Sequence, residues 1–251
     1  GATGVRRRYL EQTDLQCCFS FENTRRVFDI NPRQKFALVV ARRPGPTRSV
    51  RCGFYLDELA QIDDPARIMR YDRGFIEKAG GTYLNFLELR SPTDLAMAQT
   101  VFLQHASLRE WTPRRGIVLG RELNITDDAH RMIPVRSLRH AHLLLHEGKT
   151  IQQYDERWGA GPRYAVPLAA IRDKPAWQDS ARYFRLALRK IARSTDERTA
   201  IAAFTTPGHL FSITTTVERS PQTRSNADAL SLCAIINSFV FDWSLRQKAA
   251  V

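Results

Sequence analysis

The 251-residue sequence predicts an α+β fold, in which antiparallel hairpins and separate helices occur in one chain. Short apolar, β-branched segments bounded by proline- and glycine-rich turns predict hairpin strands. Longer segments that repeat apolar residues at helical spacing predict helices. Because the two kinds of segment do not alternate regularly, the pattern argues against a sheet built from repeated β-α-β units.

The N-terminal part contains the clearest hairpin pattern. Residues 35–43 (KFALVVARR) are apolar and β-branched, as in a buried strand, and residues 50–59 alternate polar and apolar side chains. The prolines and glycine of residues 43–49 predict the turn between them. We therefore expect a hairpin here, and residues 83–90 predict a further strand.

Two segments predict helices that pack by an apolar face. Ser91 and Pro92 are typical of a helix start, and residues 93–106 place apolar side chains at positions 95, 98, 102 and 106. Residues 226–248 are strongly apolar and predict one long C-terminal helix.

The middle of the chain is rich in loops. Residues 116–119 predict a short strand, and residues 142–159 predict a strand, a tight turn at 147–149 and a further extended piece. Residues 172–180 (RDKPAWQDS) have the composition of a surface linker. We expect one domain over residues 1–251, and 172–180 is where it would divide into two lobes.

Basic residues exceed acidic residues by 12, which favours a polyanionic partner such as nucleic acid. The alternative is a basic soluble protein without such a partner. No apolar run approaches the length of about 18 residues that a membrane helix needs, and no secretory leader is found, so we expect no membrane partner. The four cysteines lack a zinc-binding spacing, which favours reduced thiols in a cytoplasmic protein.

The segment YFRLALRKIARSTDERTAIAAFTTPG, residues 183–208, is dense in arginine. On a helix, Arg185, Arg189 and Arg193 would recur every four residues and share one face, with apolar side chains opposite. The segment therefore predicts an amphipathic helix with a basic ridge. A merely solvated face is the alternative, but three like charges repel one another and an anionic partner would relieve that repulsion.

The sequence contains no recognisable catalytic or cofactor-binding motif. It has no Gly-x-Ser-x-Gly elbow, no Walker loop and no Gly-x-Gly-x-x-Gly segment. Four histidines lie at positions 130, 140, 142 and 146, but no carboxylate partner is obvious. We therefore expect surface histidines and no metal site.

One enzymatic alternative stays open. Asp128, Glu147 and Lys149 resemble the metal-binding carboxylates and the lysine of restriction-endonuclease-type nucleases. In such a magnesium-dependent nuclease, the carboxylates hold the ion and the lysine stabilises charge that develops on the phosphate. The glycine between Glu147 and Lys149 favours a turn over the strand that this arrangement requires.

Six segments in order carry a resemblance that covers almost the whole chain. They are residues 21–43, 87–102, 109–132, 143–159, 183–208 and 230–248. They include the stretches FENTRRVFDINPRQKF, LELRSPTDLA, REWTPRRGIVLG, LLLHEGKTIQQYDERWG, YFRLALRKIARSTDERT and IINSFVFDWSLRQK, and their common order is more specific than any one of them. Together they resemble the C-terminal part of large bacterial adenine-N6 DNA methyltransferases, in which methylation accompanies restriction or phage defence.

The resemblance implies a target-recognition domain that binds duplex DNA, while a separate domain methylates the flipped adenine. The Asn-Pro-Pro-Tyr/Phe motif that holds the adenine is missing, since NPRQ at residues 31–34 lacks its aromatic residue. The glycine-rich S-adenosylmethionine loop is missing too. We expect no catalytic or cofactor-binding residue here, and the partners would be double-stranded DNA and an N-terminal methyltransferase domain that binds the cofactor.

DNA contact is expected from cations of the ridge and of the middle loops. These are Lys149, Arg185, Arg189 and Arg193 first, then Arg114, Arg115, Arg136 and Arg139. The ridge would hold phosphates, and the loops between residues 109 and 149 would read bases.

Other residues in these regions favour structural roles. Arg157 and Arg198 lie beside acidic residues and predict ion pairs, and Asn237 predicts a buried amide in an apolar helix. A basic RNA-binding or structural module is a third interpretation of the chain. The sequence lacks the aromatic-rich strands of an RNA-recognition motif, which argues against it.

Overall fold

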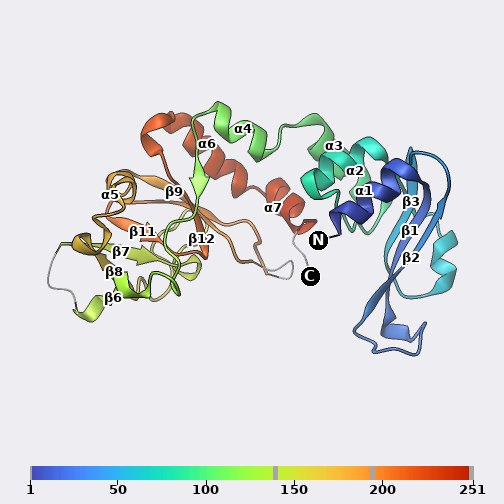
Figure 1. Cartoon of the computed structure of the whole chain (residues 1–251), viewed down its shortest axis with the longest axis horizontal. Helices are drawn as coiled ribbons and strands as arrows, with labels where there is room; N and C mark the ends of the chain where they lie inside the picture. The colour runs from blue at the N-terminus through green and yellow to red at the C-terminus, as the bar shows by residue number, and fades with distance from the viewer. Residues whose placement is uncertain (1, 138–140, 193–195, 249–251) are drawn as a thin grey trace. The chain divides into compact units, whose positions relative to one another are not determined.

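The computed structural model describes residues 2–137, 141–192 and 196–248, and shows a mixed α+β protein with several sheets (Figure 1). The chain divides into two compact units, Gly1–Ser107 and Leu108–Val251. Residues 172–180 lie inside the second unit, where they include a helix whose Trp177 is buried in a hydrophobic cluster. The composition of this segment suggests a linker because its charged residues are exposed around that single buried ring.

A four-stranded sheet forms the centre of the first unit. Its strands are β1 (Asp14–Glu22), β2 (Lys35–Arg42), β3 (Ser49–Leu56) and β4 (Met69–Asp72), in the order β2-β1-β3-β4. β1 pairs with β2 in the antiparallel and with β3 in the parallel sense. The predicted hairpin between β2 and β3 is therefore wrong, because β1 lies between them.

The turn before β3 is held against the start of β1, which explains this topology. The Thr47 hydroxyl donates to the carbonyl oxygen of Thr13 at 2.7 Å and accepts from the Leu15 amide at 2.9 Å. The Thr47 amide donates to the carbonyl oxygen of Leu10. These buried hydrogen bonds hold the turn against the start of β1. The chain therefore crosses β1, and β3 pairs with the edge of β1 opposite to β2.

The first unit also contains α1 (Thr3–Gln12), α2 (Arg73–Gly80) and α3 (Pro92–Gln104). The α3 prediction is confirmed, with Ser91 as the N-cap that accepts from the Asp94 amide at 3.2 Å. The predicted strand over residues 83–90 is wrong, since residues 84–89 are irregular. Its apolar pattern reflects Leu87 and Leu89, which are buried without a ladder partner.

The second unit contains two further four-stranded sheets. One has the order β10-β9-β12-β5 and the other β11-β7-β8-β6. The strands are β5 (Leu119–Gly120), β6 (Ile133–Pro134), β7 (His142–His146), β8 (Tyr164–Pro167), β9 (Arg185–Arg189), β10 (Ala202–Thr205), β11 (His209–Phe211) and β12 (Thr215–Glu218). Two short helices, α4 (Leu108–Arg114) and α5 (Pro175–Ser180), accompany them.

The arginine-rich segment is a strand, so the predicted amphipathic helix is wrong. β9 pairs with β10 on one side and β12 on the other, both antiparallel. Arg185 and Arg189 share one face of this strand, because every second residue does. A spacing of four therefore fits a strand as well as a helix, and the central position of β9 in its sheet decides between them.

The C-terminal segment forms two helices, α6 (Asn226–Ile236) and α7 (Phe239–Arg246), bent by 62°. The prediction of one long helix is wrong, because Ser238 starts a new helix by accepting from the Phe241 amide. The side chain of Asn237 exchanges two hydrogen bonds with the backbone of Ala202, which confirms it as a buried amide. Among the described residues, no single helix is long and apolar enough to cross a membrane, although α6 and α7 together meet that test of length and composition.

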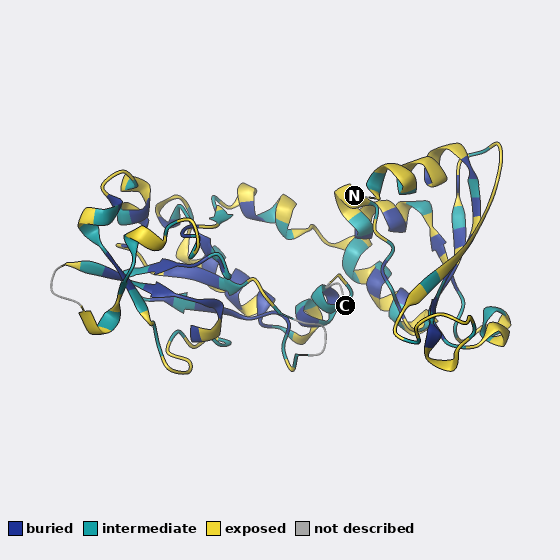
Figure 2. Cartoon of the chain, turned by 60° about the horizontal axis from the view of Figure 1, so that its bottom comes forward, coloured by how far each residue is buried: buried dark blue, intermediate teal, exposed yellow. Residues whose placement is uncertain are grey.

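The core of the second unit lies between its sheets and helices, and Figure 2 shows its strands as mostly buried. One cluster joins α6 to the sheet of β9 and β10: Ile117, Leu186, Ala200, Ala202, Leu232, Cys233 and Ile236. Another cluster joins α5 to the sheet of β7 and β8: Leu123, Leu143, Leu145, Val166, Ile171, Trp177, Ala181 and Leu210. The four cysteines of the chain are free thiols, as expected.

Asp242 attaches α7 to the chain that enters β10. One oxygen of its buried carboxylate accepts the backbone amides of Thr199 and Ala200, each at 2.7 Å. The other accepts from Arg246 at 2.8 Å. Burial raises the pKa of Asp242, but these hydrogen bonds outweigh burial and hold its pKa below the ordinary value. The ionised form is therefore the one that stabilises the fold.

We expect Asp242→Asn to lower the free energy of unfolding by about 1–3 kcal/mol at neutral pH, because an amide hydrogen would face Arg246. The stabilisation by Asp242 is complete above the unfolded-state pKa of about 3.9 and is lost as pH falls through the lower folded-state pKa. Urea denaturation across pH measures both effects. The exposed Asp179→Asn is the matched control, and equal stability and pH profiles for the two variants would contradict the assignment.

Candidate nucleic-acid interface

Arg185, the first residue of the predicted ridge, is buried rather than available to DNA. Its side chain is 1% exposed and donates to Glu122 at 2.6 Å and to Ser180 at 3.2 Å. It also donates to the carbonyl oxygen of His209 and lies 4.9 Å from the ring centre of Phe211. All of these partners are within the protein, so the expected DNA contact by Arg185 is corrected to a structural role.

Arg189 and Lys149, two other predicted contacts, do lie together. Arg189 donates to the carbonyl oxygens of Gly148 and Ile151, both at 2.8 Å, and so supports the turn that presents Lys149. The two cations line one groove, whose remaining residues are Glu147, Gly148, Trp158, Ile191 and Thr214. Arg189 thus serves mainly the backbone, and Lys149 is the exposed cation of this groove.

The groove places an exposed aromatic ring near that cation. Trp158 is 48% exposed and Ile191 is 65% exposed, so the groove has an apolar side. Gly148 is required at its base, because a Cβ there would lie 2.8 Å from the carbonyl oxygen of Thr214. A lysine beside an exposed indole suits a nucleotide, whose phosphate and base would meet a charge and a stacking surface.

The carboxylates of the nuclease alternative are bound to arginines. Glu147 accepts two hydrogen bonds from Arg163, at 2.9 and 3.0 Å, and lies 3.5 Å from Lys149. Burial opposes ionisation of Glu147, but these cations lower its pKa. Asp128 accepts from the Asn124 amide and lies 3.4 Å from Arg131. Each carboxylate thus contacts a different arginine, and Arg131 also binds Asp173 at 2.6 Å, which argues against a magnesium ion shared by Glu147 and Asp128.

The remaining predicted cations differ in their surroundings. Arg114 and Arg136 are exposed, whereas Arg115 forms an ion pair with Asp228 at 2.7 Å. Arg139 and Arg193 lie outside the described residues.

The two arginines for which we expected ion pairs do contact acids. Arg157 is highly exposed and lies 3.9 Å from Glu156. Arg198 is largely buried and contacts Asp242 at 3.7 Å. Arg198 also donates to the carbonyl oxygen of Asn237, so its role is structural, whereas the exposed contact of Arg157 contributes little to stability.

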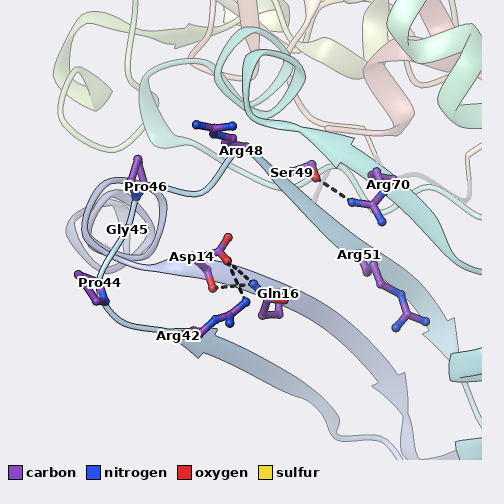
Figure 3. A pocket seen from close by; sticks show the side chains of 10 residues that line it. All are labelled: Asp14, Gln16, Arg42, Pro44, Gly45, Pro46, Arg48, Ser49, Arg51 and Arg70. Carbon is purple, nitrogen blue, oxygen red and sulfur yellow. Dashed lines mark hydrogen bonds and ion pairs between the residues drawn. The ribbon is translucent and has the colours of Figure 1, made fainter.

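The first unit holds a second cationic site that the sequence interpretation missed. An open pocket of about 410 Å³ lies beside the turn between β2 and β3 and is large enough for a phosphodiester group (Figure 3). Its cations are Arg42, Arg48, Arg51 and Arg70, all exposed. Asp14 is the acidic residue in its lining and lies 3.7 Å from Arg42.

Two arginines of this pocket face each other across a strand pair. Arg51 of β3 and Arg70 of β4 are directly opposed, so their side chains share one face of the sheet (Figure 3). Arg70 donates to Ser49 and Arg51 to the carbonyl oxygen of Ile62, both neutral acceptors. Like charges directly opposite each other destabilise a sheet, so an anion bound between them would be favourable. The alternation of polar and apolar residues within 50–59 indicates that Arg51 faces outward. Its position opposite Arg70 is known only once the register of β3 and β4 is known.

Comparison with protein-family models gives no match, and comparison with curated proteins gives none either. The candidate interface is therefore defined by two features of the chain: the arginine pocket of Arg42, Arg48, Arg51 and Arg70, and the groove of Lys149 and Trp158.

Removing the buried charge of Arg185 should strongly destabilise the fold, because its side chain binds partners within the protein. Arg185→Gln leaves the buried Glu122 with Arg219, 3.7 Å away, as its cation, and loss of the closer partner costs up to about 3–5 kcal/mol. Chemical denaturation should show a large loss of stability, while the exposed Arg182→Gln should stay close to wild type. An Arg185→Gln protein with wild-type stability and reduced DNA affinity would contradict the structural role.

Proposed function

We propose that this chain is the DNA-binding target-recognition region of a site-specific adenine-N6 DNA methyltransferase of restriction-modification or phage-defence type. Duplex DNA is its ligand. The methyl transfer and the S-adenosylmethionine site belong to a separate N-terminal methyltransferase domain. The proposal combines the resemblance of the six segments with the charge of the chain and the two cationic features of its surface.

The opposed pair Arg51 and Arg70 is the observation that carries the DNA-binding part of this proposal. Both side chains are exposed, face the same side of the sheet and contact neutral acceptors. Arg48 adds a further exposed cation to the same pocket. Planar guanidinium groups bind phosphate oxygens well, so this pocket would hold the DNA backbone.

The groove of Lys149 and Trp158 is the candidate for contact with bases. It combines a donor with an exposed aromatic surface, whereas the arginine pocket offers mainly charge. Arg114 and Arg136, exposed in the loops between residues 109 and 149, remain candidates for reading base edges, where arginine pairs with guanine. From the sequence, we expected the ridge of Arg185, Arg189 and Arg193 to bind phosphates. In this proposal the arginine pocket binds them instead.

Duplex DNA should bind the chain with an affinity that falls steeply with salt. Replacing both Arg51 and Arg70 with Gln should weaken binding to all duplexes alike and flatten the salt slope by about one unit for each lost phosphate contact. Fluorescence anisotropy over a salt series measures this. The control is Arg33→Gln, an exposed arginine outside the pocket. Binding that does not depend on salt, or equal slopes for control and double variant, would contradict the proposal.

Changes in the groove should alter sequence preference more than overall affinity. Lys149→Gln and Trp158→Ala should reduce discrimination between duplexes in a selection from a randomised library, with a loss of about 1–3 kcal/mol at the affected position. Arg172→Gln, an exposed change outside the groove, is the matched control for charge. If both groove variants select the wild-type sequences with unchanged stringency, the groove does not read bases.

A further inference from the structure

Three side chains of the second unit bring metal-ligating atoms together beside the β7–β11 pair. His146 ends β7, His209 begins β11, and Glu156 lies in the loop that follows residues 148–150. One ligand atom from each lies within 4.8 Å of the others. Two atoms bound to zinc at about 2.1 Å are at most about 4.2 Å apart, so small side-chain movements would close the set around an ion.

The hydrogen bonds of His209 leave its other ring nitrogen available. Its Nδ1 lies 2.8 Å from the carbonyl oxygen of Thr206, which can only accept, so Nδ1 carries the proton and Nε2 presents a lone pair. The amide and hydroxyl of Thr206 both donate to Glu156, at 2.6 and 3.1 Å. Thr206 therefore orients two of the three groups, as the residues behind metal ligands commonly do.

His146 also has one ring nitrogen held by a hydrogen bond and one without a hydrogen-bond partner in the described part of the chain. The hydroxyl of Thr150 donates its single proton to the carbonyl oxygen of Glu147 at 2.9 Å. Nδ1 of His146 lies 2.7 Å from the same hydroxyl, and in the tautomer in which Nδ1 is the donor, Nε2 carries the lone pair that a metal ion needs. Its Nε2 is buried and has no hydrogen-bond partner in the described part of the chain. His146 is 2% exposed, so a ligand at this nitrogen would supply the interaction that its buried lone pair lacks.

The surroundings hold both imidazoles in place. The rings of His146 and His209 are 4.5 Å apart, and Phe211 stacks on His146 at 5.6 Å. Two cations lie nearby: the charge of Arg185 is balanced by Glu122 at 2.6 Å, and Arg157 is highly exposed and lies 3.9 Å from Glu156.

We propose that His146, Glu156 and His209 bind a divalent transition-metal ion of the zinc class. Two imidazoles and one carboxylate are a ligand set that zinc accepts, and three protein ligands leave a fourth position open to water or another small ligand. This site is independent of the proposed DNA-binding function, since none of its residues lines the arginine pocket or the groove of Lys149.

Metal titration of the chelator-treated chain tests the proposal. Calorimetry should show one Zn²⁺ bound per chain, and Co²⁺ should give the visible absorption of a four- or five-coordinate ion. Changes behind metal ligands reduce affinity about 10–100-fold, so His209→Ala should reduce it at least about 100-fold. Glu156→Gln keeps one side-chain oxygen that can accept from Thr206, so we expect it to fold, and it should lose affinity to a similar extent.

His130→Ala removes an exposed histidine of the same unit and should bind metal like the wild type. Zn²⁺ should also raise the melting temperature of the wild type and of His130→Ala, but not that of Glu156→Gln. The proposal is overturned if the wild type binds no stoichiometric metal. It is equally overturned if Glu156→Gln and His209→Ala retain wild-type affinity, or if His130→Ala loses as much affinity as they do.

Discussion

The ion pair between Glu122 and Arg185 joins the two sheets of the second unit. Arg185 lies on β9 of one sheet and donates to the backbone of His209 on β11 of the other. Glu122 accepts from Arg185 and from the amide of Phe211, also on β11. Two buried charges are costly, and they are tolerated here because each is satisfied by several hydrogen bonds.

Both features of the second unit are positioned through this junction. β9 carries Arg189, which supports the turn of Lys149, and β11 carries His209 of the proposed metal site. A second buried ion pair joins Glu218 of β12 to Arg224 at 2.7 Å. Glu218 also accepts a hydrogen bond from the Leu186 amide of β9 and so links these two neighbouring strands. The many arginines in the sequence suggest a polyanionic partner, but they fall into two groups. Some are exposed, and others, such as Arg185 and Arg224, form buried ion pairs that stabilise the sheets.

Local signals in the sequence were sufficient where one short segment determines the structure. Ser91 and Pro92 start α3, and Asn237 is a buried amide, because capping and burial depend on nearby residues. The α+β class also follows from the mixture of segments. The topology of the first sheet did not, because the strand between β2 and β3 comes from residues 14–22, earlier in the chain.

The candidate sites depend on distant residues brought together by strand register. Arg51 and Arg70 become opposed only through the β3–β4 pairing, and His146 meets His209 through the parallel β7–β11 pairing. The spacing of the arginines in residues 185–193 led to the wrong prediction of a helix. Residues four positions apart share a face in a helix and in a strand alike. Lys149 and Arg189 were both selected by charge, and the fold places them in one groove with different roles.

Chemical modification of arginines, with and without duplex DNA, tests the central claim most directly. A dicarbonyl reagent reacts with accessible guanidinium groups, and mass spectrometry locates the modified residues. The account predicts that Arg51 and Arg70 react in the free chain and are protected by DNA, that Arg33 reacts in both states, and that Arg185 reacts in neither. Modification of Arg185 in the folded chain, or DNA-bound protein in which Arg51 and Arg70 stay fully reactive, would contradict it.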